Sequence, residues 1–240
     1  MIEVSNLTKH FGPKTVVRDL SFTVEPGEVL GFLGPNGAGK STTMRMVTGF
    51  LSPNSGDAKI CGISMVDHPK QAKGKIGYLP ESAPLYDDMT VVDFLKFCAS
   101  MRGLSGKARR EAVDYAIETC FLQKVAPQSI STLSKGYRHR TCLAQSLLHD
   151  PEVLILDEPT DGLDPNQKHE VRQLIARLGE TKAILFSTHI LEEVDAACTR
   201  AVIIDQGSIV ADGTPAELRE QSGSNSLHDL FRTVTTKETE

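Results

Sequence analysis

The chain of 240 residues is long enough to bury the core of one large domain or of two small ones. Hydrophobic residues make up 40% of the chain and charged residues 24%, as in ordinary soluble globular proteins, which disfavours a disordered or fibrous protein. The formal net charge of -5 argues against a general nucleic-acid binder. A local basic patch could still hide inside an acidic total, so the charge alone leaves the partner open, and we expect no nucleic-acid partner.

Charges and cysteines suggest where the protein works. The longest uncharged stretches, Val29 to Gly39 and Met46 to Gly56, have 11 residues each, whereas a membrane-spanning helix requires about 20 apolar residues. An early charge at Glu3 and the lack of an apolar block do not fit a secretory signal, so we expect a cytoplasmic protein. The cysteines are too widely spaced for C-x-x-C chemistry, and we expect all of them to be small buried hydrophobes: Cys61, Cys98, Cys120, Cys142 and Cys198.

The first third of the chain predicts strands followed by a phosphate loop. Residues 2 to 8 and 16 to 24 read as strands that form an opening antiparallel piece, which ends in a turn at Pro26 and Gly27. A continuous apolar run over 28–33 predicts a buried strand. After a glycine-rich segment, Met44, Val47 and Phe50 have helical spacing, so the order is strand, loop, helix.

The middle of the chain predicts helices and the last third predicts a parallel sheet. Residues 86 to 148 look mostly helical, with one helix start at Thr90 and Asp93 and a second helix marked by Tyr115. Strand-like runs at 152–156, 183–186 and 201–204 alternate with helical stretches at 166–178 and 190–197. A hydrophilic stretch over 220–226 then precedes a short helical face that we expect to dock, made by Leu227, Leu230, Phe231 and Val234.

One segment fits the phosphate-binding pattern G-x-x-x-x-G-K-[ST]. In such a loop the backbone N–H groups surround phosphates and the following helix adds its positive end. Lysine supplies a point charge, and the serine hydroxyl can ligate Mg²⁺. The predicted nucleotide-binding residues are Gly34, Pro35, Asn36, Gly37, Ala38, Gly39, Lys40, Ser41 and Thr42.

Two acids follow the apolar run at 153–156. In a parallel sheet they lie at the carboxyl ends of the strands, where ligands collect. We expect Asp157 to hold Mg²⁺ through water and Glu158 to polarise the attacking water. The alternative of two solvated acids at a strand end is disfavoured by the phosphate loop upstream.

Three further segments carry a resemblance to a known family. Thr132 to Arg138 (TLSKGYR), Asp157 to Pro165 (DEPTDGLDP) and Ser187 to His189 (STH) follow the phosphate loop in the order found in ATP-binding subunits of ABC transporters. The resemblance covers essentially the whole chain. It implies an α/β P-loop NTPase (RecA-like) parallel-sheet core with an N-terminal antiparallel β subdomain and an inserted α-helical subdomain at about 86–148. The ATPase domain would span 1–219 and a short tail with one helix 220–240.

The resemblance also implies roles for single residues. Ser134 and Gly136 would meet the γ-phosphate of an ATP bound by the other subunit, and Asp164 would act across the same dimer. His189 would touch the γ-phosphate and, with Lys40 and Glu158, serve catalysis. Phe11 stands where the family stacks a ring on adenine, although an aromatic in an early strand is commonly a core residue.

The chain departs from the family pattern at several positions. Glu81 replaces the usual glutamine that touches Mg²⁺. Its carboxylate can also ligate Mg²⁺, so we expect Glu81 among the metal ligands, but it adds negative charge beside the phosphates. Lys135 replaces a glycine and would add positive charge near the partner's phosphates, and Tyr137 replaces a glutamine. For His139, where the exporter-like pattern has another glutamine, the sequence offers no account.

The sequence thus predicts an ATPase that uses ATP and Mg²⁺ and powers a separate membrane permease, as a homodimer or with a similar subunit, held at the inner face of the cell membrane. The LPE sequence at 79–81 and the LSKGYR sequence at 133–138 resemble those of exporter-type systems of the gliding-motility and drug-efflux branch. The alternatives are a soluble ABC ATPase acting on ribosomes or DNA, and a nucleotide switch with little turnover. Pro84, Leu85 and Tyr86 form the expected permease contact, unless Leu85 and Tyr86 fold back as a lid on the helices.

Overall fold

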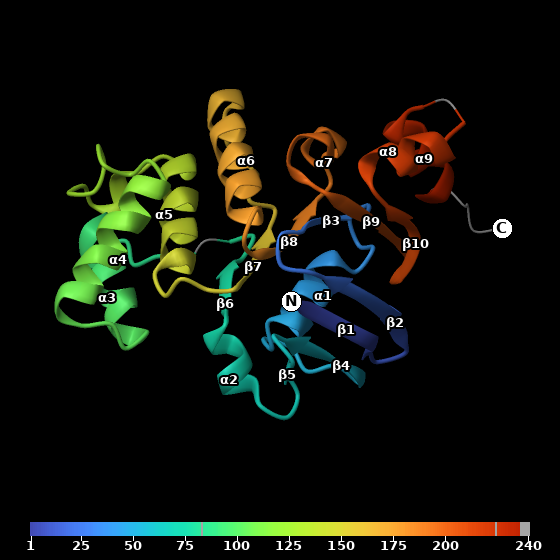
Figure 1. Cartoon of the computed structure of the whole chain (residues 1–240), viewed down its shortest axis with the longest axis horizontal. Helices are drawn as coiled ribbons and strands as arrows, with labels where there is room; N and C mark the ends of the chain where they lie inside the picture. The colour runs from blue at the N-terminus through green and yellow to red at the C-terminus, as the bar shows by residue number, and fades with distance from the viewer. Residues whose placement is uncertain (83, 224, 236–240) are drawn as a thin grey trace.

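Two sheets and a group of helices make up the chain. The computed structural model describes residues 1–82, 84–223 and 225–235 (Figure 1). One sheet is antiparallel and has the order β2-β1-β4-β5. Its strands are β1 (Ile2–Phe11), β2 (Lys14–Val24), β4 (Ser55–Ile60) and β5 (Ile63–Ser64).

The second sheet has the order β10-β9-β3-β8-β7-β6, in which all neighbours except β10 and β9 run parallel. Its strands are β3 (Val29–Leu33), β6 (Ile76–Leu79), β7 (Val153–Asp157), β8 (Ala183–Thr188), β9 (Arg200–Asp205) and β10 (Ser208–Gly213). Every residue of β3, β7 and β8 is buried. Continuous apolar runs are what a parallel sheet covered on both faces requires.

Alternate residues of the central strands enter two different cores. Val153 and Ile155 of β7 pack with α1 (Lys40–Val47) and the antiparallel sheet, so that α1 lies between the two sheets. Leu154 and Leu156 face the opposite core, with α5 (Lys135–Leu147) and α6 (Pro165–Gly179). This side-chain alternation follows from strand geometry. It confirms the predicted α/β core with an opening antiparallel subdomain.

The helical part lies at one end of the parallel sheet, beside β6 (Figure 1). It holds α3 (Val91–Met101), α4 (Gly106–Thr119), a 3-10 turn (Ile130–Thr132) and α5. The predicted helix start is confirmed, because the Thr90 hydroxyl accepts a hydrogen bond from the Asp93 amide. Just before it, Leu85 packs on the helical core, as in the lid alternative, whereas Tyr86 is 58% exposed.

The C-terminal segment packs on the edge of the parallel sheet. It contains α7 (Leu191–Ala197), α8 (Pro215–Gln221) and α9 (Leu227–Thr235), which share a core with β3 and β9. Leu227 and Leu230 of α9 are buried there, so the predicted docking face covers this chain's own sheet. The domain boundary expected after residue 219 falls inside α8 and stays a prediction. Residues 224 and 236–240 of the expected tail lie outside the described residues.

Some local expectations were wrong. Phe50 is 79% exposed, because α1 ends at Val47 and Gly49 adopts a positive φ of 66° that turns the chain away. Tyr115 does lie in the predicted second helix, α4, but its side chain is exposed. Three cysteines are only partly buried, namely Cys61, Cys98 and Cys198. In the described part of the chain, no helix is both long and apolar enough to cross a membrane.

Candidate functional site

The predicted phosphate loop connects β3 to α1. Gly39 stands directly before the helix with φ 110°, and a Cβ there would approach the Val16 carbonyl oxygen of β2 to 2.8 Å. Both features require glycine. The loop is wrapped by its own chain: Gly34, Ala38, Gly39 and Lys40 are buried, Pro35, Ser41 and Thr42 half-buried, and Asn36 and Gly37 exposed.

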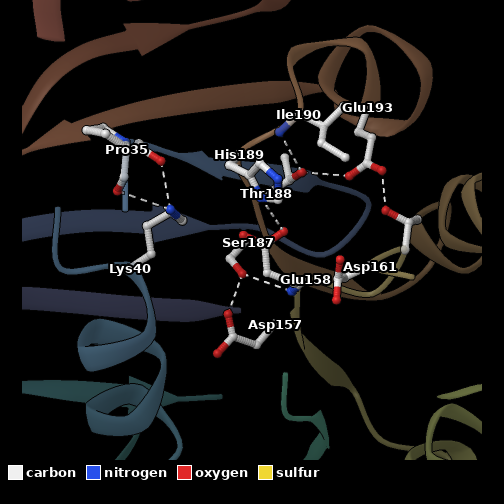
Figure 2. A network of polar contacts seen from close by, with 12 residues as sticks. Pro35, Lys40, Asp157, Glu158, Asp161, Ser187, Thr188, His189, Ile190 and Glu193 are labelled. Carbon is white, nitrogen blue, oxygen red and sulfur yellow. Dashed lines mark hydrogen bonds and ion pairs between the residues drawn. The ribbon is translucent and has the colours of Figure 1, made fainter. Parts of the chain in front are cut away.

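Lys40 is the only cation that lines the groove beside this loop in the described part of the chain. The groove is lined by Val16, Asn36, Gly37, Gly39, Lys40, Ser41, Thr42, Glu81 and Glu158. The Lys40 Nζ donates hydrogen bonds to the carbonyl oxygens of Gly34, at 2.7 Å, and Pro35, at 3.3 Å (Figure 2). Burial lowers the pKa of Lys40, whereas Glu158, Asp157 and Glu81 raise it. The sequence-predicted lysine and acids therefore act on one another in the fold.

Asp157 and Glu158 stand where β7 ends beside β8. Asp157 pairs in register with Ser187, whose hydroxyl donates a short hydrogen bond to the Asp157 carboxylate. The Glu158 amide donates to the Ser187 hydroxyl at 3.0 Å. Burial raises the pKa of Asp157, and the hydrogen bond from Ser187 opposes that effect. Ser187 thus fixes both acids, a role that the sequence motifs did not single out.

Glu158 and His189 form a pair across the end of the sheet. The His189 Nδ1 lies 3.0 Å from the Glu158 Oε2 (Figure 2). Glu158 has a positive φ of 51°, an uncommon backbone conformation for a residue other than glycine. Burial raises the pKa of Glu158, and His189 lowers it in part. A half-buried carboxylate that lines a groove and is oriented by an imidazole is suited to accept a proton.

The charge of this region fits a divalent cation. Glu81, Asp157 and Glu158 all act electrostatically on Lys40, so the negative charge near the groove exceeds the single positive charge of Lys40. Mg²⁺ prefers oxygen ligands and is held by one or two carboxylates together with phosphates. The Ser41 hydroxyl at the start of α1 and the buried Asp157 carboxylate offer such oxygens. Among the residues that are described, no cluster of three or more His, Cys, Asp or Glu forms a closed metal site.

The predicted residues of the second nucleotide face lie on other elements. Ser134 is exposed and caps α5, accepting a hydrogen bond from the Tyr137 amide at 3.4 Å. A Cβ on Gly136 would come within 2.3 Å of the Gln167 side chain, so this position is tightly packed against α6. Asp164 caps α6 by accepting from the Gln167 amide at 2.9 Å. None of these three lines the groove of Lys40.

The unusual residues near Ser134 have partners within the chain. Lys135 forms an ion pair of 2.8 Å with Asp161, and its side chain is exposed. Its positive charge is therefore partly neutralised within the chain and partly available to a partner. His139 is buried on α5, where its pKa is lowered by burial and raised by Asp161 and by the Pro159 backbone. His139 is therefore close to the segment after Glu158, which the sequence did not reveal.

Phe11 is 50% exposed at the end of β1, with the Lys9 ammonium 5.5 Å from its ring centroid. It is not a core residue. An exposed ring at a strand end leaves adenine stacking open to it, although Phe11 is not among the residues that line the Lys40 groove.

Comparisons with known proteins agree with this geometry. A family model described as "ABC transporter" matches residues 17–161, more than half of the chain. The linearmycin resistance ATP-binding protein LnrL of Bacillus subtilis is 37% identical over 232 residues, which are 96% of this chain and 74% of that protein. The Nod factor export ATP-binding protein I of Paraburkholderia xenovorans is 40% identical over 90% of this chain and 72% of its own length. A solved ATP-binding subunit of an ABC transporter superposes with a TM-score of 0.88 at 30% identity, covering 98% of this chain and 99% of that one.

Proposed function

The chain belongs to the ABC transporter family as an ATP-binding subunit that hydrolyses ATP, and on this premise we propose how its residues divide the work. One observation carries the proposal. Lys40, Glu81 and Glu158 line a single groove, and Glu158 is held by His189. Phosphoryl transfer depends mainly on positioning and on neutralising charge, and this groove offers both.

Within the groove each group has a role that its surroundings support. The loop amides and the start of α1 would surround the ATP phosphates, and Lys40 would leave its two loop carbonyls to neutralise their charge. Ser41, Asp157 and Glu81 would hold Mg²⁺, which when bound neutralises charge on the phosphate oxygens. Glu158 would accept a proton from the attacking water, and His189 would orient Glu158 and contact the γ-phosphate.

The second nucleotide face implies a dimer. Ser134 and Gly136 open α5 outside the groove of Lys40, so one chain does not bring them onto its own nucleotide. We infer that the exposed end of α5 and the Asp164 turn meet the ATP bound by a second copy or by a similar subunit. Each ATP would then be enclosed between two chains.

The membrane partner would dock near the helical part. An exposed apolar set, which we call the apolar rim, consists of Phe50, Tyr86, Phe97 and Met101. Lys73 donates to the Gly49 carbonyl and Arg102 donates to the Lys73 carbonyl, which links the ends of α1 and α3 through α2 (Pro69–Gly74). Exposed apolar surface of this kind suits a protein contact.

We infer that an integral membrane permease covers the apolar rim and that the subunit lies at the inner face of the cell membrane. The names of the relatives, which refer to resistance and to Nod factor export, favour an exporter-type system for this chain. No specific observation favours the two alternatives, which are a soluble ABC ATPase acting on ribosomes or DNA and a nucleotide switch with little turnover.

The test of the site is Glu158→Gln. The amide keeps the shape of the side chain but cannot accept a proton, so hydrolysis should fall by about 100-fold or more while ATP binding is kept. ATP-bound dimers should then accumulate with Mg²⁺ and ATP, as measured by light scattering after gel filtration. Phosphate release should be measured with and without the membrane subunits. Wild-type turnover in this variant would remove Glu158 from its assigned role, and monomers at saturating ATP would contradict the shared site.

A further inference from the structure

Behind the groove, α7 carries a carboxylate that neither the family motifs nor the proposed mechanism uses. Glu193 is 0% exposed, and both of its oxygens are occupied. Its Oε2 accepts a hydrogen bond of 2.6 Å from the Thr188 hydroxyl, and its Oε1 accepts a short one from the Thr160 hydroxyl (Figure 2). An Arg172 nitrogen of α6 lies 3.5 Å from Oε1. A buried charge is costly unless it is paired, so these three partners hold the Glu193 carboxylate in one position.

The two threonines belong to the two segments that carry the catalytic pair. Thr188 immediately precedes His189, and Thr160 follows Glu158 by two residues. Both threonines are buried, with exposures of 0% and 1%. Glu193 therefore fastens the end of β8 to the segment after β7 at the place where His189 and Glu158 are 3.0 Å apart.

We propose that Glu193 is a positioning residue for ATP hydrolysis, which sets the contact between His189 and Glu158 by holding Thr188 and Thr160 on its two oxygens. The inference rests on the proposed roles of Glu158 and His189. Glu193 itself does not line the groove, so it acts through those two residues. The competing explanation is that Glu193 only stabilises the packing of α7.

Substitutions that remove single hydrogen bonds separate these explanations. In Glu193→Gln the amide nitrogen cannot accept from a hydroxyl, so one of the two threonines can no longer donate its hydrogen bond to residue 193. We expect kcat to fall by about tenfold, the effect typical of losing a group that orients an active residue, while KM for ATP changes by less than about twofold. Thr188→Val and Thr160→Val should lower kcat in the same way, whereas Thr188→Ser and Thr160→Ser should keep the wild-type kcat because they keep the hydroxyl.

The matched control is Glu192→Gln on the same helix. Glu192 is exposed and contacts only the His228 imidazole, at 3.5 Å, among the ion pairs of the described residues. This variant loses the same charge without touching the threonines, and its kcat should equal that of the wild type. Thermal unfolding of all variants shows whether they fold. If Glu193→Gln does not fold, the valine and serine pair at Thr188 decides the question.

The decisive measurement combines Glu193→Gln with His189→Ala. If Glu193 acts through His189, Glu193→Gln should reduce kcat no further in a chain that already carries His189→Ala. Independent, multiplying losses would overturn the inference and leave Glu193 a structural residue. Equal kcat values for Thr188→Val and Thr188→Ser would also overturn the inference. If Glu158→Gln and His189→Ala themselves leave kcat intact, the proposed function fails instead.

Discussion

At the scale of single residues, Lys40 carries the positive charge of the groove. Its charge is opposed by those of Glu81, Asp157 and Glu158, so removing it would leave three carboxylates near the phosphates of an incoming ATP. A hydrogen bond to a charged group contributes about 1.5–3 kcal/mol, and Lys40→Ala should therefore weaken ATP binding by about 10- to 100-fold and remove most turnover. Fluorescent-nucleotide binding and phosphate release measure both effects.

The same substitution at Lys107, an exposed residue of α4 that pairs with Glu111, is the control and should change neither quantity. Wild-type binding in Lys40→Ala would refute the assignment of the phosphate loop.

Glu81 tests whether the extra carboxylate of this chain is essential. Its charge raises the pKa of both Lys40 and Asp157. Glu81→Gln removes that charge but keeps an oxygen that can face Mg²⁺. We expect activity within about tenfold of the wild type, measured as phosphate release over a series of Mg²⁺ concentrations. Loss of activity at every Mg²⁺ concentration would show that the negative charge itself is required.

At the scale of elements, what the sequence could predict depended on whether a signal was local. The runs that became β3, β7 and β8 are continuously apolar and were predicted correctly. β4, with the sequence SGDAKI, was not predicted, because its strand character comes from pairing with β1 and not from its own pattern. α2 was not predicted either, because its PKQAKG sequence buries only Ala72 and so carries no apolar periodicity.

The candidate site divides in the same way. Lys40, Asp157 and Glu158 belong to contiguous motifs, and the fold brings them close enough to act on one another, although their roles stay predictions. Ser187 and Glu193 could not be assigned from motifs. Their roles depend on the register that sets Asp157 opposite Ser187 and on the packing of α7 against the strand ends.

His149 ties the segment after α5 to β6 and predicts a pH-dependent stability. Its Nε2 donates to the Ile76 carbonyl at 3.0 Å, and its Nδ1 is buried with no partner among the described residues. Burial, with Arg102 nearby, lowers the pKa of His149 from 6.5 to about 4. Below about pH 6.5 the unfolded chain therefore binds a proton at His149 that the folded chain does not bind. This contribution to stability is present above pH 6.5 and is lost as the pH falls towards 4.

His149→Gln should keep the hydrogen bond to Ile76 and remove the titration. Between about pH 7 and pH 5, the variant should lose about 2 kcal/mol less of its unfolding free energy than the wild type, as measured by urea denaturation. His169→Gln on the exposed side of α6 is the control and should follow the wild type. Equal losses in His149→Gln and the wild type would mean that another group accounts for the acid sensitivity.

At the scale of the whole molecule, the ATPase site must be coupled to a membrane partner. Glu81 lines the groove, and the segment that follows it leads to Tyr86, whose ring meets those of Phe94 and Phe97 at 6.1 and 5.7 Å. The apolar rim is therefore connected by a short stretch of chain to Glu81, a residue that lines the groove. Leu85 belongs to the helical core and not to the rim, so a charge there would disturb folding.

The sharper test of docking is thus Tyr86→Asp combined with Met101→Asp, at positions that are 58% and 73% exposed. Two charges placed in a desolvated contact should abolish association with the membrane subunits, because neither would find a partner there. The isolated subunit should keep its thermal stability and its basal ATPase activity. Tyr115→Asp, at another exposed aromatic on α4, is the control and should still bind. Co-purification from membranes measures the outcome, and a doubly charged variant retained as well as the wild type would place the docking surface elsewhere, since a site buried under the permease cannot accept two unpaired carboxylates without loss of affinity.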